Sequence, residues 1–410
     1  MQFPEGLRAL NHRDFRLFWS GQLISLIGTW MQSVGQSWLI IELTNSPLKL
    51  GLISALQFTP VLLLSLFAGA LADRLPKRKL LIITQTVLML LAFILAALKY
   101  TGHVQYWHVA LLATALGIVQ ALDVPLRQAY LAEMVGKEDL VNAIALNSAI
   151  FNGARILGPA VAGILVARFG VALAFFMNGI SFIAVIGALV AIRSEGLPRP
   201  RRDRTMLQDI REGVTYAVQT PTVLLLLSLL LIVSLFVINY NVLVPVLAKD
   251  GLHMEAQGFG LLMSALGAGA LAGSVAMAFM GRRQPPQSLV IGAALVLCVA
   301  TLAVAGAHQF YGAVALLFII GCAQILFTAN CNTAIQMTTP DELRGRVMSL
   351  YALVFAGVVP AGAFFTGWVT EAFGPWMGYF ADGGLGLVGA LLLLGWWRFI
   401  RPHRRPAFGR

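Results

Sequence analysis

Charged residues are scarce in this sequence, and their scarcity decides the class of protein. Only 11% of the 410 residues are charged, whereas 58% are hydrophobic and the mean hydropathy is +0.80. In soluble domains about 25% of the residues are charged. A soluble fold is therefore excluded, and we expect an integral membrane protein.

Cysteine and histidine are also rare. The three cysteines, Cys298, Cys322 and Cys331, lie inside apolar stretches, where we expect them to act as small apolar residues rather than as disulfide partners. The 6 histidines are scattered, with no pair at ligand spacing. This pattern argues against a dedicated zinc, nickel or copper site, and we predict neither a metal nor a cofactor.

Acidic residues are outnumbered by basic ones, 18 against 29, and the net charge is +11. Because the basic residues mostly flank apolar stretches, this excess does not indicate binding to nucleic acid. The sequence contains no Walker loop, no HExxH and no GxSxG motif. We therefore expect neither ATP-driven chemistry nor an enzyme, and any transport would draw its energy from an ion gradient.

Long apolar runs fill most of the chain. About 20 uncharged residues in a helix cross the roughly 30 Å of a bilayer core. Such runs lie near 17–43, 48–72, 80–100, 106–132, 140–167 and 170–192, and near 221–247, 257–281, 288–307, 309–335, 347–370 and 375–397. The pattern predicts an all-α membrane protein with twelve transmembrane helices, six in each half.

The distribution of basic residues predicts the orientation, since cytoplasmic loops are enriched in Lys and Arg. With both chain ends in the cytoplasm, only Lys49, Lys99, Arg168 and Lys249 lie outside, and Arg155 lies within a span. The first sixteen residues are polar, and the apolar run after them is too long for a cleavable signal. We therefore expect a multi-pass protein whose first span remains as an anchor.

One stretch of sequence occurs twice. QALDVPLRQAYLAEMVGKEDLVNAIALN, around Gln120, matches QILFTANCNTAIQMTTPDELRGRVMSL, around Gln324, at an offset of about 203 to 204 residues. This offset is half the chain, so the repeat predicts two pseudo-symmetric six-helix bundles. Secondary transporters with such repeats bind their cargo between the halves and expose it alternately to each side.

The boundary between the predicted bundles is a change in composition. Residues 193–204 are basic and contain prolines, and residues 205–218 show the periodicity of a helix lying at the membrane surface. We therefore predict an N-terminal bundle over 1–192, a cytoplasmic linker with an interfacial helix over 193–220, a C-terminal bundle over 221–398 and a basic cytoplasmic tail over 399–410.

The segment GALADRLPKRK, residues 69–79, combines small residues, an acid at a span end and a basic cluster. It resembles the signature loop of the major facilitator superfamily, although Pro76 stands where that family usually has Gly. The matching positions are Gly69, Leu71, Asp73, Arg74, Arg78 and Lys79. In that family the loop gates the conformational cycle and contacts no substrate, so the resemblance implies a gating role here.

The fifth predicted span carries a stripe of small residues, Ala154, Gly158 and Ala162, next to Pro159 and Gly163. Such stripes commonly serve only close helix packing. The GPxxxG pattern of Gly158, Pro159 and Gly163 is also similar to the fifth-helix motif of antiporters in the superfamily, which implies export.

The resemblance narrows to one branch over nearly the whole chain. NHRDFRLFWSGQLISLIGTWMQ, ELTNSPLKLG, RILGPAVAG and PDELRGRVMSLY are similar to the bacterial exporters of siderophores, macrolides and multiple drugs and to lysophospholipid flippases. The resemblance implies the major facilitator fold, a bacterial plasma (inner) membrane location and a monomer, and it does not fix the cargo.

Polar residues within spans are candidates for cargo binding because they need a cavity or a partner in hydrocarbon. On the first span Gly21, Ser25, Gly28, Thr29, Gln32 and Gln36 fall within about 100° of one another on a helical wheel, and we expect this face to line water. In the second half the candidates are Asn239, Asn241, Gln324, Thr328, Cys331 and Asn332. Hydrogen bonding between helices alone is the alternative for each of them.

Four charged residues lie clearly within spans. Asp123 and Arg127 stand four apart on one helix, so a structural ion pair is the leading interpretation and proton carriage by Asp123 the alternative. Arg155 could hold an anionic or carbonyl group of the cargo, or pair with an acid of another helix. Asp382 is the second candidate for proton coupling.

The sequence therefore predicts an exporter of an amphiphilic small molecule (a drug, a siderophore or a similar compound) that works by proton antiport and alternating access. Uptake by proton symport and lysophospholipid flipping are the alternatives within transport. A lipid-modifying or sensory membrane protein is the alternative outside it. The expected partners are the cargo, protons and the lipid bilayer.

Overall fold

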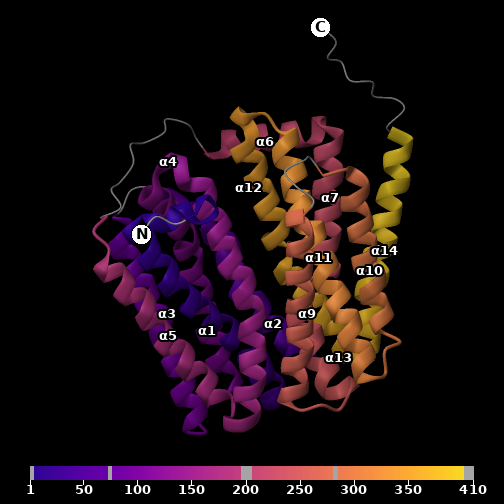
Figure 1. Cartoon of the computed structure of the whole chain (residues 1–410). Helices are drawn as coiled ribbons and strands as arrows, with labels where there is room; N and C mark the ends of the chain where they lie inside the picture. The colour runs from indigo at the N-terminus through magenta and orange to yellow at the C-terminus, as the bar shows by residue number, and fades with distance from the viewer. Residues whose placement is uncertain (1–3, 73–75, 195–205, 280–284, 401–410) are drawn as a thin grey trace.

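The computed structural model describes residues 4–72, 76–194, 206–279 and 285–400, and within them the fold is entirely helical (Figure 1). The elements are η1 Glu5–Asn11, α1 Arg13–Thr44, α2 Pro47–Ala72, α3 Lys77–Tyr100, α4 Tyr106–Phe169, α5 Val171–Ala191, α6 Met206–Gln219, α7 Pro221–Phe236, α8 Tyr240–Val246, η2 Leu247–Gly251, α9 Ala256–Phe279, α10 Gln287–Val304, α11 Phe310–Thr338, α12 Asp341–Gly357, α13 Val359–Phe373 and α14 Pro375–Ile400.

Among these described residues, eleven helical segments are long and apolar enough to cross a membrane. The predicted first span, α1, has 32 residues but is not among them. The serine, glutamine and glycine residues on one side of α1 lower its mean hydropathy. Its length would be enough to cross a membrane. The all-α membrane class is thus confirmed.

The predicted spans 106–132 and 140–167 are both found: Tyr106–Gly136 and Glu138–Val166 are each long and apolar enough to cross a membrane, and α4 joins them through a kink at Gly136, where φ is 70°. The predicted span 221–247 is divided into α7 and α8 by residues 237–239, and the span 347–370 is divided at Val358. The interfacial helix predicted over 205–218 is α6.

The backbone repeats the sequence duplication. Gly170 between α4 and α5 has φ 78° and ψ 170°, and Gly374 between α13 and α14 has φ 85° and ψ 170°. Each glycine donates its N–H to a carbonyl four residues earlier. A positive φ favours glycine because it has no Cβ. The two positions are 204 residues apart, which agrees with the offset predicted from the sequence.

Helices of each half pack mainly with one another. In the first half α1 and α3 lie against α4 and α5, and in the second α11 packs on α9 and α10, while α14 packs on α10 and α13. Figure 1 shows the first-half helices in indigo to magenta beside the second-half helices in pink to yellow. The halves meet where α2 contacts α13 and where α4 contacts α9.

Several contacts join the two halves near the end of α1 and the start of α2. Glu371 Oε2 accepts a hydrogen bond of 2.5 Å from the Ser46 hydroxyl and one of 3.0 Å from the Leu48 N–H. Lys249 Nζ donates to the Ile41 carbonyl at 3.1 Å, and the Trp38 and Phe259 rings stack at 5.7 Å. We call the Glu371 contacts with Ser46 and Leu48 the latch.

Candidate functional site

A polar cavity of about 340 Å³ lies in the first half. Its lining comes from α1, α2, α3, α4 and α5. The polar lining residues are Gln22, Ser25, Thr29, Gln32, Ser33, Gln36, Gln57, Gln120, Asp123, Arg127, Gln128, Asn147 and Asn178, and the apolar ones include Leu26, Leu88, Leu116, Phe151 and Phe182. Amide groups offer donors and acceptors without fixed charge. This cavity can therefore hold a molecule with both polar and apolar parts.

The amides of α1 have partners on neighbouring helices. Gln32 is buried, and its Oε1 accepts a 2.6 Å hydrogen bond from Asn178 Nδ2. The Gln36 amide donates to Gln57 Oε1 at 3.4 Å. Both glutamines also line the cavity, as predicted. They are held in place on one side and remain available to a cargo on the other.

Two members of the predicted face of α1 do not line water. A Cβ on Gly28 would lie 2.4 Å from Ser181 Oγ, and one on Gly21 would lie 3.0 Å from the Ala184 carbonyl oxygen. Both contacts belong to α5. The prediction for these two glycines is wrong because they allow α1 and α5 to pack closely, while Ser25, Thr29, Gln32 and Gln36 reach the cavity.

The Asp123 carboxylate is held on several sides. Its Oδ1 accepts 2.7 Å hydrogen bonds from Thr84 Oγ1 and from Gln85 Nε2, and its Oδ2 forms an ion pair with Arg127. Asp123 is 2% exposed, whereas the Arg127 side chain is 21% exposed and reaches the cavity. The ion pair predicted from the four-residue spacing is confirmed.

The second-half candidates lie elsewhere. The cavity lining named above contains none of Asn239, Asn241 and Gln324. Asn239 is buried and its side-chain amide donates to the Leu235 carbonyl at 2.9 Å and to Asp382 Oδ2 at 3.5 Å. Gln324 is buried on α11, and Asn241 is half-buried on α8. The proposed grouping of these residues with Gln32 around one cavity is therefore not seen in this conformation.

Arg155 lies on α4 and has no acidic partner among the described ion pairs. The guanidinium is half-buried on α4 and interacts electrostatically with Tyr240 of α8. In the described part of the chain no ion pair joins Arg155 to Asp123 or to another carboxylate. Arg155 thus lies at the boundary between the halves, where a cargo group could reach it.

The gating residues are partly described. Asp73 and Arg74 lie outside the described residues, and Gly69 falls in the last turns of α2. Arg78 Nε and Nη2 donate to the Leu189 and Val190 carbonyls at 2.7 and 2.6 Å. An arginine satisfies the free carbonyls and the negative dipole end of a helix well, so Arg78 ties the start of α3 to the end of α5.

The GPxxxG glycines contact two different partners. A Cβ on Gly158 would lie 2.4 Å from Trp30 Cβ of α1, within the same half. A Cβ on Gly163 would lie 2.7 Å from Gly260 Cα of α9, in the other half. Pro159 stands between them and contributes its carbonyl to the surroundings of Gly260. Close packing was predicted at this motif. The structure shows that Gly158 allows α4 to pack on α1 within the first half, and that Gly163 allows α4 to pack on α9 of the second half.

Sequence reasoning missed several members of the site. Asn178 and Gln57 line the cavity and bind the two glutamines, and Thr84 and Gln85 hold Asp123. Asn178 could have been found, since it is an isolated amide in the very apolar span Val171–Ala191. The pairing of Thr84 with Asp123 depends on how α3 packs on α4, which no local pattern reveals.

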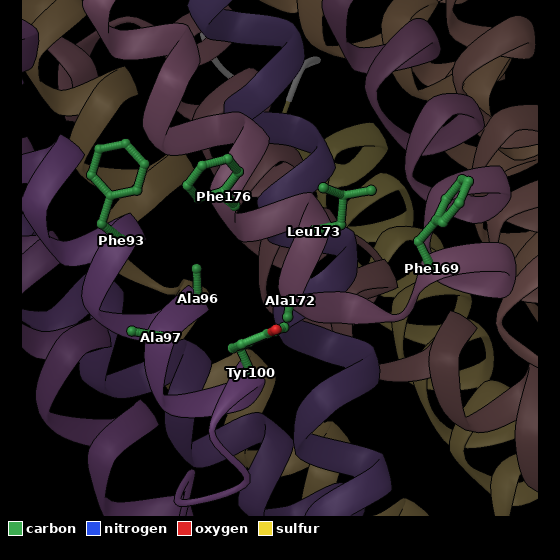
Figure 2. Close-up of a pocket in the computed structure, with 8 residues that line it drawn as sticks. All are labelled: Phe93, Ala96, Ala97, Tyr100, Phe169, Ala172, Leu173 and Phe176. Atoms are coloured by element: carbon green, nitrogen blue, oxygen red, sulfur yellow. The ribbon is translucent and has the colours of Figure 1, made fainter.

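A second cavity is larger and apolar. It has a volume of about 850 Å³ and is lined by Phe93, Ala96, Ala97, Tyr100, Phe169, Ala172, Leu173 and Phe176 (Figure 2). In Figure 2 these side chains come from α3, from the end of α4 and from α5, and Tyr100 supplies the only oxygen among them. Phe169 and Tyr100 are largely exposed. Such a surface suits lipid chains and has no polar group to orient a cargo, so we assign the cargo to the polar cavity.

Solved structures with the same arrangement are transport proteins. The chain superposes with a TM-score of 0.76 on a bacterial homolog of the human lysosomal transporter Spinster in an inward-facing, unoccupied conformation, at 14% identity over 97% of this chain and 98% of that one. The TM-score is 0.71 with a bacterial homologue of the iron transporter ferroportin in an inward-facing state, at 17% identity over 94% and 98% of the two chains. At these identities the likeness shows the fold alone: a membrane fold that transporters share.

The sequence then places the chain within that class. The family described as transmembrane secretion effector, of the major facilitator superfamily, matches residues 5–399, and the chain belongs to this family. The superfamily resemblance found in the motifs is thus confirmed. The family and the relatives described next indicate a transporter.

Its curated relatives are bacterial proteins of similar length. The staphyloferrin A transporter of Staphylococcus aureus is 25% identical over 88% of this chain and 90% of its own. The multidrug efflux pump Tap of Mycolicibacterium fortuitum is 26% identical, and the macrolide efflux protein A of Streptococcus pyogenes 23% identical, each over 85% of this chain and 87% of its own. These relatives handle chemically different molecules, so they do not specify the cargo of this chain.

Proposed function

We propose that the protein exports an amphiphilic small molecule by alternating access. Its twelve spans would form two bundles of six helices each. The observation that carries this proposal is the polar cavity, in which amides from four helices surround an ion pair and face phenylalanine and leucine side chains. A lining of this kind accepts large molecules with mixed polarity. The names of the curated relatives, two of which are efflux proteins, favour export over uptake.

The proposal includes a bacterial plasma-membrane location and a monomer. The excess of basic residues in the predicted cytoplasmic loops favours an orientation with both ends in the cytoplasm. In this orientation the latch lies at the outer face, and the contacts between α2 and α13 and between α4 and α9 close that face. The structure then corresponds to the inward-facing state, in which cargo from the cytoplasm reaches the cavity.

Cargo contacts are assigned first to Gln32 and Gln36, which already line the cavity. Arg155, Asn239, Asn241 and Gln324 join the cargo path when the second half rocks toward the first. Arg155 is positioned for this role because it already interacts with Tyr240 across the boundary. An anionic or carbonyl group of the cargo would bind there.

Proton antiport supplies the energy. Each 100 mV of membrane potential contributes about 2.3 kcal/mol per proton, enough to concentrate a neutral cargo roughly fiftyfold. Asp123, Arg127 and Asp382 are the proposed coupling residues. For Asp123 to take up a proton, the access change must move Arg127 away, because the carboxylate now has three donor groups. Asp382 has no ion-pair partner among the described residues that would have to move away first.

A screen of a deletion strain tests the cargo class. Growth and intracellular accumulation would be measured with a macrolide, a siderophore and a lysophospholipid, with and without the gene restored. Export predicts that the deletion strain accumulates one of these compounds and that the restored gene reverses it. Equal accumulation of all three in both strains would count against export of these classes. Faster accumulation with the gene present would indicate uptake.

The latch gives a prediction about the conformational cycle. Glu371→Gln removes the negative charge that Ser46 and the start of α2 bind. A hydrogen bond to a charged group contributes about 1.5–3 kcal/mol, so the ratio of inward- to outward-facing molecules should fall by roughly tenfold or more. Labelling of a cysteine introduced at Ala363, which is buried against Gly51 of the other half, reports opening of the outer face after Cys298, Cys322 and Cys331 are replaced.

Glu255→Gln is the matched control for this experiment. Glu255 is an exposed acid just before α9 on the same face, and this substitution should leave the labelling rate unchanged. Equal labelling of the wild type and the Glu371→Gln variant would mean that the latch does not stabilise the closed outer face.

A further inference from the structure

The second half contains a break in a membrane helix that the polar cavity does not include. Residues 237–239 separate α7 from α8, whereas the corresponding α1 is continuous. The Asn239 side chain donates to the Leu235 carbonyl, the acceptor that a backbone N–H four residues later would use in a continuous helix. In transporters, interrupted helices near the contact between repeats commonly form ion sites.

An acid lies next to this break. Asp382 of α14 is 0% exposed, and its Oδ2 accepts a 2.7 Å hydrogen bond from the Thr366 hydroxyl and a 3.5 Å one from Asn239. Its other oxygen, Oδ1, is buried and has no hydrogen-bond partner among the described residues. Buried polar atoms normally have partners, so an unpartnered carboxylate oxygen indicates a ligand.

Two tyrosines near Asp382 also have buried hydroxyl oxygens without hydrogen-bond partners among the described residues. Tyr240 directly follows Asn239, whose amide donates to Asp382, and Tyr379 precedes Asp382 by three residues on α14. Three buried oxygens without partners thus belong to Asp382 and to residues at the break or within one turn of it, and each can bind a cation or a shared proton.

Few other titratable groups face this cluster. Cys298 of α10 interacts with Tyr240, and Arg155 of α4 approaches Tyr240 from the first half. Thr366 is the contact from α13. Over the described ranges, no Lys, Arg or His forms an ion pair with Asp382, in contrast to Asp123 with Arg127. A charge on Asp382 is thus uncompensated unless a cation binds.

We propose that Asp382, Tyr240 and Tyr379 form the site at which the coupling cation binds. This inference rests on the proposed ion-driven export and names its ion site. A proton would bind Oδ1 of Asp382 and form an O–H bond that donates to a tyrosine oxygen, and no other bond changes. A sodium ion would be bound by the same oxygens.

Infrared difference spectroscopy of the purified full chain in lipid nanodiscs tests the site without a cargo. Lowering the pH only to about 6, where exposed carboxylates with pKa values near 4 stay ionised, should produce the carbonyl stretching band of a buried protonated carboxyl group in the wild type. The band should be lost in Asp382→Asn and kept in Asp123→Asn. Asn has the size of Asp and offers an oxygen to Thr366, so the fold should survive. Sodium binding would instead make NaCl, but not KCl, suppress this band at constant pH.

Tyr240→Phe and Tyr379→Phe keep the acid and remove one hydroxyl each. Each should shift the pH midpoint or the sodium midpoint of the Asp382 band. A band that persists in Asp382→Asn, or that responds neither to pH nor to sodium, would overturn the site, as would unchanged midpoints in both Phe variants. If Asp382 responds but no cargo is exported, the site stands and the export proposal is wrong. If proton-driven export occurs but the Asp382 band responds neither to pH nor to sodium, the export proposal stands and the site is wrong.

Discussion

Gly158→Leu is expected to abolish transport. Even a Cβ at this position would lie 2.4 Å from Trp30 Cβ, 3.0 Å from the Ile27 carbonyl oxygen and 3.1 Å from the Met31 nitrogen. Backbone atoms cannot give way as a flexible side chain can, so α4 would be forced off α1. Overpacking of this kind costs about 1–3 kcal/mol or more, and we expect transport below roughly a tenth of the wild-type rate.

The same helix provides a matched control. A Cβ at Gly153 meets nothing within 4 Å, so Gly153→Leu should transport at close to the wild-type rate. Gly163→Leu should act differently from both: the clash is with Gly260 of the other half, so the bundle should fold while the outer face fails to close. Transport in proteoliposomes, together with thermal stability in detergent, separates the three variants. Wild-type transport by Gly158→Leu would refute the close-contact interpretation of GPxxxG.

Arg127→Gln is expected to destabilise the protein strongly and to stop transport. It leaves the Asp123 carboxylate, which is 2% exposed, with Thr84 and Gln85 but without its cation. Removing one partner of a buried ion pair costs about 3–5 kcal/mol. The double variant Asp123→Asn with Arg127→Gln should regain much of the lost stability, because no uncompensated charge remains.

Thermal unfolding of the three variants in detergent measures this coupling. Two single variants as stable as the wild type would show that the pair does not hold α4 in place. Transport adds a second readout: Asp123→Asn is expected to uncouple or stop proton-driven efflux if the pair switches during the cycle. Unchanged proton release on cargo binding in that variant would assign the carrier role to Asp382 and leave Asp123 structural.

Periodicity and length were enough to locate the helices, and spacing was enough to pair Asp123 with Arg127. Both features are local. The pattern of consecutive residues predicts a helix, and residues four apart lie on the same face of it. The repeat offset was also visible, and Gly170 and Gly374 repeat it in the backbone. These parts of the fold follow from the sequence because each depends on one helix at a time.

Contacts between helices were harder to predict. Gly21 and Gly28 share a face with Gln32, yet they pack on α5, because the width of the water-lined strip depends on how closely the neighbour approaches. The break before Tyr240 involves neither proline nor glycine at 237–239, and it arises where an Asn side chain takes the place of a backbone donor. The latch joins residues about 325 positions apart, beyond any local pattern.

Transport by inverted membrane vesicles tests the central claim most directly, since their interior corresponds to the outside of the cell. A macrolide, a siderophore and a fluorescent cationic dye would be supplied to vesicles that contain the protein and an acidic interior. Export by proton antiport predicts that one of them accumulates, that the interior becomes more alkaline as it enters, and that a protonophore abolishes both effects. Accumulation that survives the protonophore, or that occurs only in right-side-out vesicles with an inward proton gradient, would contradict the account.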